Sequence, residues 1–411
     1  MTALTRDDFL ALDAADELAP FREQFVLPDD VIYMDGNSLG VLPRTAAARV
    51  QDVVTREWGQ DLIKSWNSAD WINLPQRVGA LIAGLIGTDA ANVVAADSTS
   101  INLYKLAAAA LRMQAPRRKI ITELGNFPTD LYVLQGLAEY LDVELVAVPR
   151  DQILDVVDED TALVSLTHVH YKTGVMFDMP SVTKAVQAKG ALMLWDLCHS
   201  AGALPVRLED CNADMAIGCG YKYLNGGPGA PAFLYVAARH QAAVQPPLSG
   251  WMGHARPFDF TDVYTPAAGI TRNLCGTPGV IAMSILEESL KIFAKVDLSL
   301  LRKKSQHMGQ QFMQLIEQEC ATYGFTIVSP WDNDMRGSQV SLGHDEGYAI
   351  MQALIARGLI GDFRAPEVLR FGLTPLYLRY QDLWDAVAIL RDVMESGVWN
   401  QEDYKRRSAV T

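Results

Sequence analysis

Seven short runs of strand-forming residues, several of them separated by helical patterns, are the feature of this sequence that most limits its fold. The runs are Asn92–Ala96, Lys119–Thr122, Glu144–Val148, Ala162–Thr167, Ala191–Trp195, Met215–Gly218 and Ala232–Val236. Such alternation predicts right-handed crossovers and a mostly parallel sheet flanked by helices, that is, an α/β fold. The run Ala191–Trp195 is apolar on both faces, as expected of a central strand covered by helices. Ligands of such sheets bind outside the carboxyl ends of the strands, so we expect the chemistry there.

The sequence predicts three units, which are an N-terminal arm (1–42), a large α/β domain (43–290) and a smaller C-terminal α+β domain (291–411). The large domain is expected to begin with one long amphipathic helix from Pro43 to Trp66, because its apolar residues recur at helical spacing. In the small domain we expect strands near Thr326–Val328, Gln339–Leu342 and Val368–Leu373 and helices at Glu346–Arg357 and Tyr380–Ser396. Gln401–Thr411 is predicted to be a loosely held tail.

The balance of charges excludes several classes of partner. Lys and Arg number 35 and Asp and Glu number 49, which gives a formal net charge of −14. Such a field repels phosphodiester backbones and anionic lipid surfaces, so we expect neither nucleic acid nor membrane partners. No apolar run approaches the roughly 18 residues that a bilayer requires, and the N-terminus lacks the features of a signal peptide. The five cysteines are widely spread without a C-x-x-C pair, so a reducing cytoplasm fits best.

An acidic residue and a lysine follow two of the predicted buried strands. Asp196 ends the run Ala191–Trp195, and Lys222 follows the run Met215–Gly218. Burial of a lysine lowers its pKa and makes the amine nucleophilic. If a pyridoxal phosphate ring lay across these strand ends, Asp196 would keep its nitrogen protonated and Lys222 would form the imine. The alternative is that Asp196 caps a helix and Lys222 is a solvated loop residue.

Two further segments supply the parts that a flat phosphorylated cofactor needs. The segment Phe127-Pro128-Thr129-Asp130 opens a predicted helix, where the aromatic face of Phe127 is able to stack on a ring. Hydroxyl groups and free backbone N–H groups at Ser98-Thr99-Ser100 begin another helix and would cradle a phosphate. Taken alone, a phenylalanine such as Phe127 is more often a core residue, and the segment Ser98-Thr99-Ser100 is explained as a helix cap.

Five motifs, in this order along the chain, resemble the kynureninase family. They are Tyr33-Met-Asp-Gly-Asn-Ser-Leu-Gly40, Gly125-Asn-Phe-Pro-Thr-Asp130, Trp195-Asp-Leu-Cys-His-Ser-Ala-Gly202, Gly220-Tyr-Lys-Tyr-Leu-Asn225 and Gly276-Thr-Pro278. The resemblance implies the aspartate aminotransferase fold, a homodimer with shared active sites and pyridoxal phosphate as cofactor. It also implies hydrolysis of L-kynurenine to anthranilate and L-alanine in tryptophan catabolism, and it leaves open the preference between L-kynurenine and its 3-hydroxy form.

The resemblance also implies roles for individual residues. Lys222 would be the lysine that binds the cofactor and Asp196 the partner of the ring nitrogen, with Tyr221 as a proton relay. The remaining cofactor contacts would come from Thr99, Ser100, Phe127, Pro128, Thr129, Asp130, Thr167, His199 and Tyr221 of one subunit and from Trp251 and Thr277 of the second. Thr167 is aligned by position alone. Arg370 would hold the α-carboxylate of the substrate, and the alternative for it is an internal salt bridge to Asp362 or Glu367.

Other readings of the sequence concern metal, nucleotide and cysteine chemistry. Thr167-His168-Val-His170 ends a predicted strand and, with Asp196 and His199, would suit a metal-dependent amidohydrolase, although the histidines are also explained as structural hydrogen-bonding groups. We expect no metal site. Asn225-Gly-Gly-Pro-Gly229 lacks the spacing of a dinucleotide loop and is expected to be a turn. Cysteine desulfurases need a mobile catalytic cysteine, for which no candidate is obvious, and aminotransferases are the other close competitors.

Overall fold

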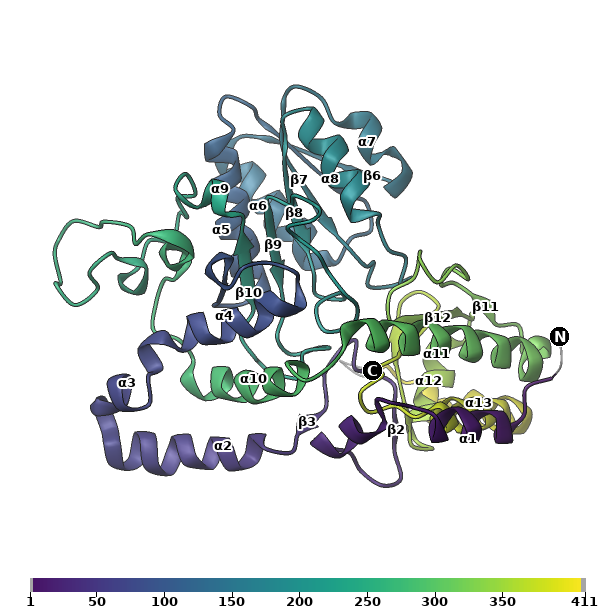
Figure 1. The fold of residues 1–411 in the computed structure, drawn as a ribbon. Coiled ribbons are helices and arrows are strands. Elements are labelled where there is room, and N and C mark those ends of the chain that lie inside the picture. The colour runs from purple at the N-terminus through teal and green to yellow at the C-terminus, as the bar shows by residue number, and fades with distance from the viewer. Residues whose placement is uncertain (1–2, 408–411) are drawn as a thin grey trace.

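The computed structural model describes residues 3–407 and contains one large mixed sheet covered by helices on both faces (Figure 1). In the described part of the chain, the order of its seven strands is β4-β10-β9-β8-β7-β5-β6. Their bounds are β4 (Val93–Ala95), β5 (Lys119–Glu123), β6 (Glu144–Val148), β7 (Thr161–Thr167), β8 (Leu192–Asp196), β9 (Met215–Gly218) and β10 (Phe233–Val236). Strands β5 to β9 pair in parallel, whereas β10 runs antiparallel to both β9 and β4. The prediction of a mostly parallel sheet in an α/β fold is confirmed, and each predicted run is a strand to within a residue or two at each end.

Both faces of this sheet are buried because successive residues of its strands point to opposite sides. On β8, Leu192 and Leu194 pack on one side, and Met193 and Trp195 pack on the other. The first side is covered by α5 (Thr99–Met113) and α6 (Pro128–Leu141). The second is covered by α4 (Leu74–Leu85), α8 (Met179–Ala188) and α10 (Val280–Phe293). This arrangement leaves the carboxyl ends of the parallel strands as the open edge.

A smaller antiparallel sheet follows, with strand order β11-β12-β15-β14. Its strands are β11 (Thr326–Ile327), β12 (Gln339–Gly343), β14 (Asp362–Arg364) and β15 (Val368–Gly372). The helices around it are α11 (Leu298–Glu319), α12 (Gly347–Ile355) and α13 (Tyr380–Ser396). The strands and helices predicted for this part of the chain are present, and β14 is an additional strand that the sequence did not indicate. The predicted domain boundaries at residues 42 and 290 stay predictions.

The N-terminal arm lies along the small sheet and its helices. Helix α1 (Arg6–Ala14) packs on α13, with the buried ring of Phe9 5.9 Å from that of Trp384. Strand β2 (Ile32–Tyr33) pairs with β13 (Leu359–Ile360), and β1 (Phe25–Val26) pairs with β3 (Leu42–Pro43). Figure 1 shows α1 and α13 side by side although they come from opposite ends of the chain. The arm therefore belongs to the packed structure of the C-terminal half.

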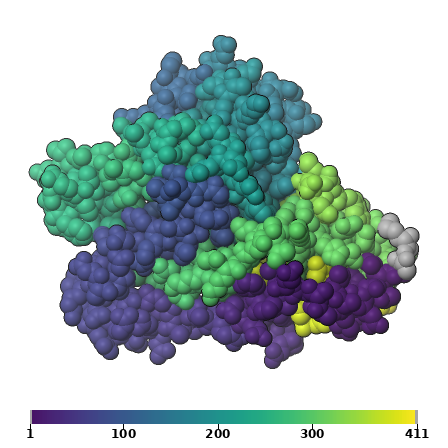
Figure 2. Space-filling view, in the orientation of Figure 1, coloured from purple at the N-terminus to yellow at the C-terminus, as the bar shows by residue number. Residues whose placement is uncertain are grey.

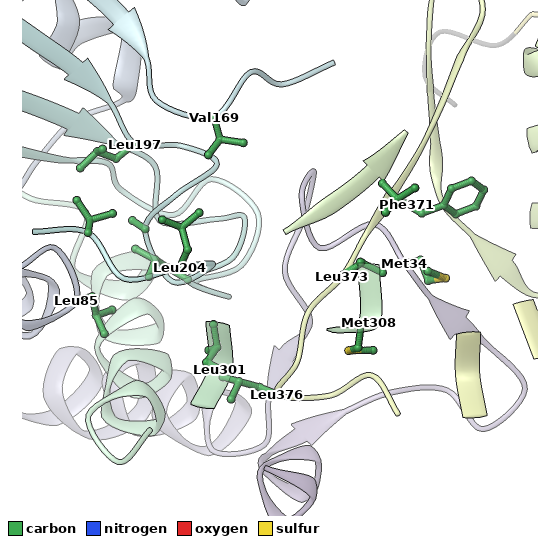
Figure 3. Packing of buried hydrophobic residues seen from close by; sticks show 14 of the residues in the cluster. Met34, Leu85, Val169, Leu197, Leu204, Leu301, Met308, Phe371, Leu373 and Leu376 are labelled. Atoms are coloured by element: carbon green, nitrogen blue, oxygen red, sulfur yellow. The ribbon is translucent and has the colours of Figure 1, made fainter. Parts of the chain in front are cut away.

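One apolar cluster joins the two parts of the molecule. Figure 3 shows Leu85, Leu197 and Leu204 from the large part and Met34, Met308 and Phe371 from around the small sheet. All six side chains are buried. Continuous packing of this kind fixes how the small sheet faces the edge of the large one.

Two sequence predictions are wrong at the level of single elements. The expected long helix from Pro43 to Trp66 is α2 (Ala46–Asp52) followed by a π-helical segment, Val53–Asp61, a 3₁₀ turn and the short α3 (Ser65–Ser68). Gly59 and the positive φ of 55° at Leu62 interrupt the α-helical pattern. The expected loose tail includes α14 (Glu402–Lys405), where Tyr404 packs against the core, and residues 408–411 lie outside the described residues.

No helix within residues 3–407 combines the length and the apolar character that crossing a bilayer requires.

Candidate active site

A pocket at the carboxyl ends of β7 and β8 collects most of the residues singled out in the sequence. Its wall includes the predicted residues Thr99, Ser100, Phe127, Thr129, Asp130, Thr167, Asp196, His199, Tyr221 and Lys222. Pro128 is the first residue of α6, directly behind Phe127, and is absent from the pocket wall. The predicted residues thus come from five separate segments that the sheet topology brings together.

Lys222 lies deep in this pocket rather than in solvent. Its Nζ is 3.0 Å from Nε2 of His199, and only 9% of the residue is exposed. Burial lowers the pKa of the Lys222 ammonium, but nearby acidic groups, Cys219 and Asp196 among them, raise it by more, so the pKa lies above its usual value. The expectation of a lowered pKa for Lys222 is therefore wrong for the chain without a bound cofactor. The alternative of a solvated loop lysine is also wrong.

His199 faces Lys222 as a neutral ring. Burial and the charge of Lys222 hold the pKa of His199 well below its usual range. A neutral ring can accept a hydrogen bond from the Lys222 ammonium through Nε2. Its other nitrogen, Nδ1, is buried and has no hydrogen-bond partner among the described residues. An unpaired buried donor or acceptor costs free energy, so this atom marks a place where a ligand group fits.

Two buried carboxyl groups, Asp130 and Asp196, meet around the hydroxyl of Thr167. The Thr167 Oγ1 lies 3.2 Å from Asp196 Oδ2 and 3.4 Å from Asp130 Oδ2, and it lies 2.6 Å from Asn126 Oδ1. The other oxygen of Asp196 accepts a hydrogen bond from the backbone N–H of Cys198 at 2.8 Å. Burial and the charge of Asp196 raise the pKa of Asp130 well above its usual range. The surroundings of Asp130 therefore favour its protonated form.

Asp196 directs its carboxylate into the pocket from the last residue of β8, which is fully buried along its length. It does not cap a helix, so that alternative is wrong. Thr167, which was aligned by position alone, lies between Asp196 and Asp130, with its hydroxyl near a carboxyl oxygen of each.

Phe127 supplies a flat apolar wall to the pocket. It is the residue before α6 and remains 37% exposed, and the Lys222 Nζ lies 5.6 Å from the centre of its ring. The edge of Tyr171 meets this ring with centroids 5.2 Å apart. An aromatic side chain held in this way can stack on a planar ligand.

The start of α5 forms the polar end of the pocket. Ser98 caps this helix by accepting a hydrogen bond from the Ile101 N–H, which leaves Thr99 and Ser100 in the first turn. The first N–H groups of a helix attract anions, and a hydroxyl at this position adds a donor. Tyr221 lies on the same wall, and burial raises its pKa to about 12. This end of the pocket is suited to a phosphate group.

Trp251 and Thr277 do not reach this pocket within the chain. Trp251 packs edge to face against Trp66 with centroids 6.2 Å apart, in an aromatic hollow that also includes Phe258 and Phe260. Thr277 lines a separate small cavity beside Asp97. Their predicted role requires a second subunit and stays a prediction.

Arg370 lies next to the pocket but behind its wall. Its Nε and Nη2 donate to the carboxylate of Asp362, and its Nη1 donates to the carbonyl oxygen of Tyr171 at 2.5 Å. The internal salt bridge considered as the alternative is therefore present, with Asp362 as its partner. Contact of Arg370 with substrate stays a prediction.

Sequence reasoning missed three residues of the pocket or its network: Tyr171, Cys198 and Asn126. Tyr171 lies in a loop after β7, where no periodic pattern marks a buried side chain. Asn126 and Cys198 stand inside two of the quoted motifs, so their position in these motifs was the available signal. The hydrogen bond with Cys219 and burial raise the pKa of Cys198 well above its usual value, so its thiol is a poor nucleophile.

The competing motifs have structural partners. His168 lies 2.9 Å from the Ser200 hydroxyl, and His170 lies 3.1 Å from the Gly125 carbonyl oxygen. Burial lowers the pKa of His168 to about 3 and also lowers that of His170. Both contacts fit the structural reading of these histidines. Asn225–Gly229 forms a turn before β10, with positive φ at Asn225, Gly227 and Gly229.

Comparison with solved structures shows the fold. A C-DES variant with glycine covalently linked to its PLP cofactor superposes with a TM-score of 0.80, 16% identity and coverage of 90% of this chain and 99% of that chain. A cysteine desulfurase from Thermococcus onnurineus gives a TM-score of 0.77, 17% identity and coverage of 92% and 98%. The chain therefore has the aspartate aminotransferase-like fold.

Comparison with known sequences shows the family. The family model described as the Kynureninase C-terminal domain matches residues 301–390. A kynureninase from Burkholderia pseudomallei is 52% identical over 99% of this chain and 100% of its own length. A kynureninase from Pseudomonas fluorescens is 50% identical over the same shares of both chains. The chain belongs to the kynureninase family.

Proposed function

We propose that this protein is a kynureninase that hydrolyses L-kynurenine to anthranilate and L-alanine with pyridoxal phosphate as its cofactor. The observation that carries the proposal is the meeting of Lys222 and Asp196 in one buried pocket that Phe127 walls with its ring. A lysine to bind an aldehyde, a carboxylate for a ring nitrogen and an aromatic face are the three groups that this cofactor needs.

The residues present fit the cofactor. The buried Nδ1 of His199 lacks a partner among the described residues, and the first turn of α5 offers N–H groups and hydroxyls at the far end of the pocket. Lys222 would bind the cofactor, Asp196 its ring nitrogen, and Thr99, Ser100 and Tyr221 its phosphate. Asp130, Thr129, Thr167 and His199 would complete its surroundings.

When bound, pyridoxal phosphate supplies an electron sink that stabilises negative charge on the carbon next to the substrate's amino group. The residues of this chain orient that chemistry and move its protons. The Asp196 carboxylate favours a protonated ring nitrogen, and Phe127 fixes the plane of the ring. The amine of Lys222 moves protons at the substrate's α-carbon, and Tyr221 is placed to relay a proton to the released alanine fragment.

We also propose a cytoplasmic homodimer whose active sites include Trp251 and Thr277 of the second subunit. An exposed apolar surface around Trp66 and Trp251, to which Phe258 and Phe260 add their rings, supports an interface between copies. Cysteines that are all free in the described structure support a reducing compartment.

Purified protein provides the direct test. Borohydride should fix the cofactor to one lysine, and peptide mapping should place it on Lys222. Lys222→Ala should abolish hydrolysis of L-kynurenine and weaken cofactor binding, because both depend on this amine. Mapping of the cofactor to Lys172 or Lys105 would contradict the site assignment. Loss of activity on chelation, without a bound cofactor, would favour the metal-dependent alternative.

A further inference from the structure

Arg370 has few hydrogen-bond donors left for a substrate. A guanidinium group carries five N–H bonds. The Nε–H bonds Asp362 Oδ1 at 2.7 Å, and the two Nη2–H groups face Asp362 Oδ2 and the Ser38 Oγ, the latter at 3.0 Å. One Nη1–H bonds the Tyr171 carbonyl oxygen. Within the described residues, four of the five donors are therefore in use, and the residue is 1% exposed.

This arrangement does not suit the simplest form of carboxylate recognition. A bidentate pair requires two parallel N–H groups from one guanidinium. Arg370 could offer two only by giving up its bond to Ser38 or to Tyr171. A carboxylate that meets Arg370 as the structure has it needs a second donor from another residue.

Arg364 is placed to supply this donor. Its Nη2 donates to the same Asp362 carboxylate, at 2.7 Å from Oδ2, and its Nη1 donates to the carbonyl oxygen of Phe363 at 2.9 Å. Its Nε–H and one Nη1–H have no partner among residues 3–407. Its side chain is 32% exposed, whereas that of Arg370 is 2% exposed. A solute can therefore reach Arg364 first.

The two arginines lie behind the part of the pocket wall that Tyr171 forms, and neither lines the pocket itself. Tyr171 lines the pocket, and the guanidinium carbon of Arg370 lies 6.0 Å from the centre of its ring. Lys172 donates from Nζ to the carbonyl oxygen of Ala365 at 2.9 Å, which fixes the segment after Arg364 beside the same loop. Burial raises the pKa of Tyr171, and the positive charges of Arg370 and Arg364 offset part of this rise. Both charges therefore act on a residue of the pocket wall.

The charges in this cluster favour an anion. Asp362 accepts from both guanidinium groups, and burial raises the pKa of Asp362 while the two arginines lower it below its usual value. One carboxylate thus balances two positive charges. The second carboxyl group nearby is Asp35, whose Oδ1 is buried without a partner in the described structure. Burial and the charge of Asp362 raise the pKa of Asp35 to about 7, so it does not fully neutralise the remaining charge.

We propose that Arg364 and Arg370 share the α-carboxylate of the substrate, with Asp362 holding both guanidinium groups in place. Arg364 then determines specificity for substrates that carry this carboxylate, and Asp362 is a positioning residue. The proposal rests on the proposed function, because it assumes that the pocket takes an α-amino acid.

The test compares two small ligands that differ in one charge. L-Alanine carries the amine and the carboxylate, and L-alaninamide carries the amine alone. In Arg364→Gln holoenzyme, the Kd of L-alanine measured by calorimetry should rise roughly 10- to 100-fold, the range expected for loss of a charge-assisted hydrogen bond. The Kd of L-alaninamide should stay within about 2-fold of its wild-type value. The cofactor absorbance should not change.

Two further variants calibrate the result. Arg364→Lys should recover part of the affinity for L-alanine, because it restores the charge without the planar donor pair. Arg391→Gln removes an arginine that pairs with Glu319, far along the chain, and should leave both affinities unchanged. The KM for L-kynurenine should follow the affinity for L-alanine in all three variants, with a smaller effect on kcat.

An unchanged Kd for L-alanine in Arg364→Gln would overturn the proposal and would indicate that the substrate displaces Ser38 and binds Arg370 alone. Equal losses for L-alanine and L-alaninamide would also overturn it, because they would indicate a structural role. Failure of the proposed function would look different. In that case the wild-type holoenzyme would not cleave L-kynurenine, while the alanine comparison would still report on the two arginines.

Discussion

Asp130 and Asp196 illustrate how position alone gives different roles to two identical side chains. Both are buried and both approach the Thr167 hydroxyl, but only Asp196 accepts a backbone hydrogen bond on its second oxygen, from Cys198. Two carboxylates this close do not both ionise easily. Burial and the charge of Asp196 raise the pKa of Asp130, so the protonated form of Asp130 is favoured.

The charge on Asp196 is the basis of a prediction for catalysis. Asp196→Asn keeps the shape of the side chain but loses the charge that favours a protonated ring nitrogen. We expect kcat for L-kynurenine to fall roughly 100-fold or more, which corresponds to about 3 kcal/mol in the transition state. Asp196→Glu should lose less. Steady-state kinetics on cofactor-saturated variants provides the measurement, and near wild-type turnover in the Asn variant would contradict the role.

Asp35 predicts a pH dependence of stability. Burial and the charge of Asp362 raise its pKa to about 7 in the folded chain, from about 4 in an unfolded chain. Between about pH 4 and pH 7 the Asp35 carboxyl group is therefore protonated in the folded chain and ionised in the unfolded chain. The contribution of Asp35 to stability is present in full below about pH 4 and is lost as the pH rises through about 7. Asp35→Asn mimics the protonated form and should be more stable than wild type at pH 8.

Urea unfolding of both proteins at pH 5 and pH 8 measures this difference. The advantage of Asp35→Asn should be about 1–3 kcal/mol at pH 8 and smaller at pH 5, because wild type regains its proton at the lower pH. Asp30→Asn, an exposed aspartate five residues earlier, serves as the control. An advantage that does not vary with pH would show that Asp35 does not titrate in this range.

At the scale of elements, the predictions from sequence were most accurate where several successive residues are buried in the same way. The strands of the large sheet are apolar on both faces, so they stand out as short continuous runs. Strand β14 was missed because it has three residues, of which Asp362 and Arg364 are charged. It exists because it pairs with β15 and because Asp362 forms an ion pair with Arg370, and neither contact has a local signal.

The same distinction applies to the candidate site. Residues inside motifs, such as Asp196 and Lys222, could be singled out, because they follow strands of a recognisable sheet. Tyr171 could not, since its place is set by packing against Phe127 and by the Arg370 contact to its carbonyl oxygen. Gly40 is a motif residue whose identity the packing explains. A Cβ there would lie 2.3 Å from the Lys222 carbonyl oxygen, so only glycine allows the arm to approach the lysine's loop.

One buried lysine of helix α11 joins this helix to the N-terminal arm. Lys304 Nζ donates to Asp16 Oδ2 at 2.7 Å and to the carbonyl oxygens of Pro375 and Leu378 at 2.6 and 2.8 Å. Lys304→Met removes the charge and leaves the Asp16 carboxylate, which is 7% exposed, without its partner. We expect a loss of about 3–5 kcal/mol in the free energy of unfolding.

Urea denaturation followed by circular dichroism measures this loss. Lys303→Met changes the neighbouring exposed lysine and should cost less than about 0.5 kcal/mol. A similar small change in Lys304→Met would mean that the arm is held by its apolar contacts alone.

At the scale of the whole molecule, the two residues of the predicted site that lie outside the pocket come from the same region. Trp251 belongs to the long segment after α9 (Ala238–Gln241), and Thr277 lies just before α10. Figure 1 shows this segment extending away from the large sheet, and Figure 2 shows it as a projecting part of the surface on the left. Exposed apolar side chains gather there and on the turn before α3, among them Ile63, Phe258 and Phe260. A surface of this kind is expected to be covered by another chain.

Mixed dimers test whether this second chain completes the active site. Each site would consist of Lys222 from one subunit and Thr277 from the other. Lys222→Ala removes the amine, and Thr277→Asp places a negative charge beside the cofactor phosphate, so each homodimer should have little activity. In a hybrid, one site combines both changes and the other has neither. Random exchange makes about half of the dimers hybrids, so about a quarter of wild-type activity should return.

Subunits with two different affinity tags establish that hybrids form, and tandem purification should enrich the activity to about half of wild type. Thr261→Asp adds the same charge at an exposed position of the projecting segment and should remain active as a homodimer. If Thr277 acts within its own subunit, the Lys222→Ala chain cannot repair the Thr277→Asp chain, and purified hybrids should be inactive. Recovery of activity therefore depends on the site being shared, because neither chain holds both intact residues in one site by itself.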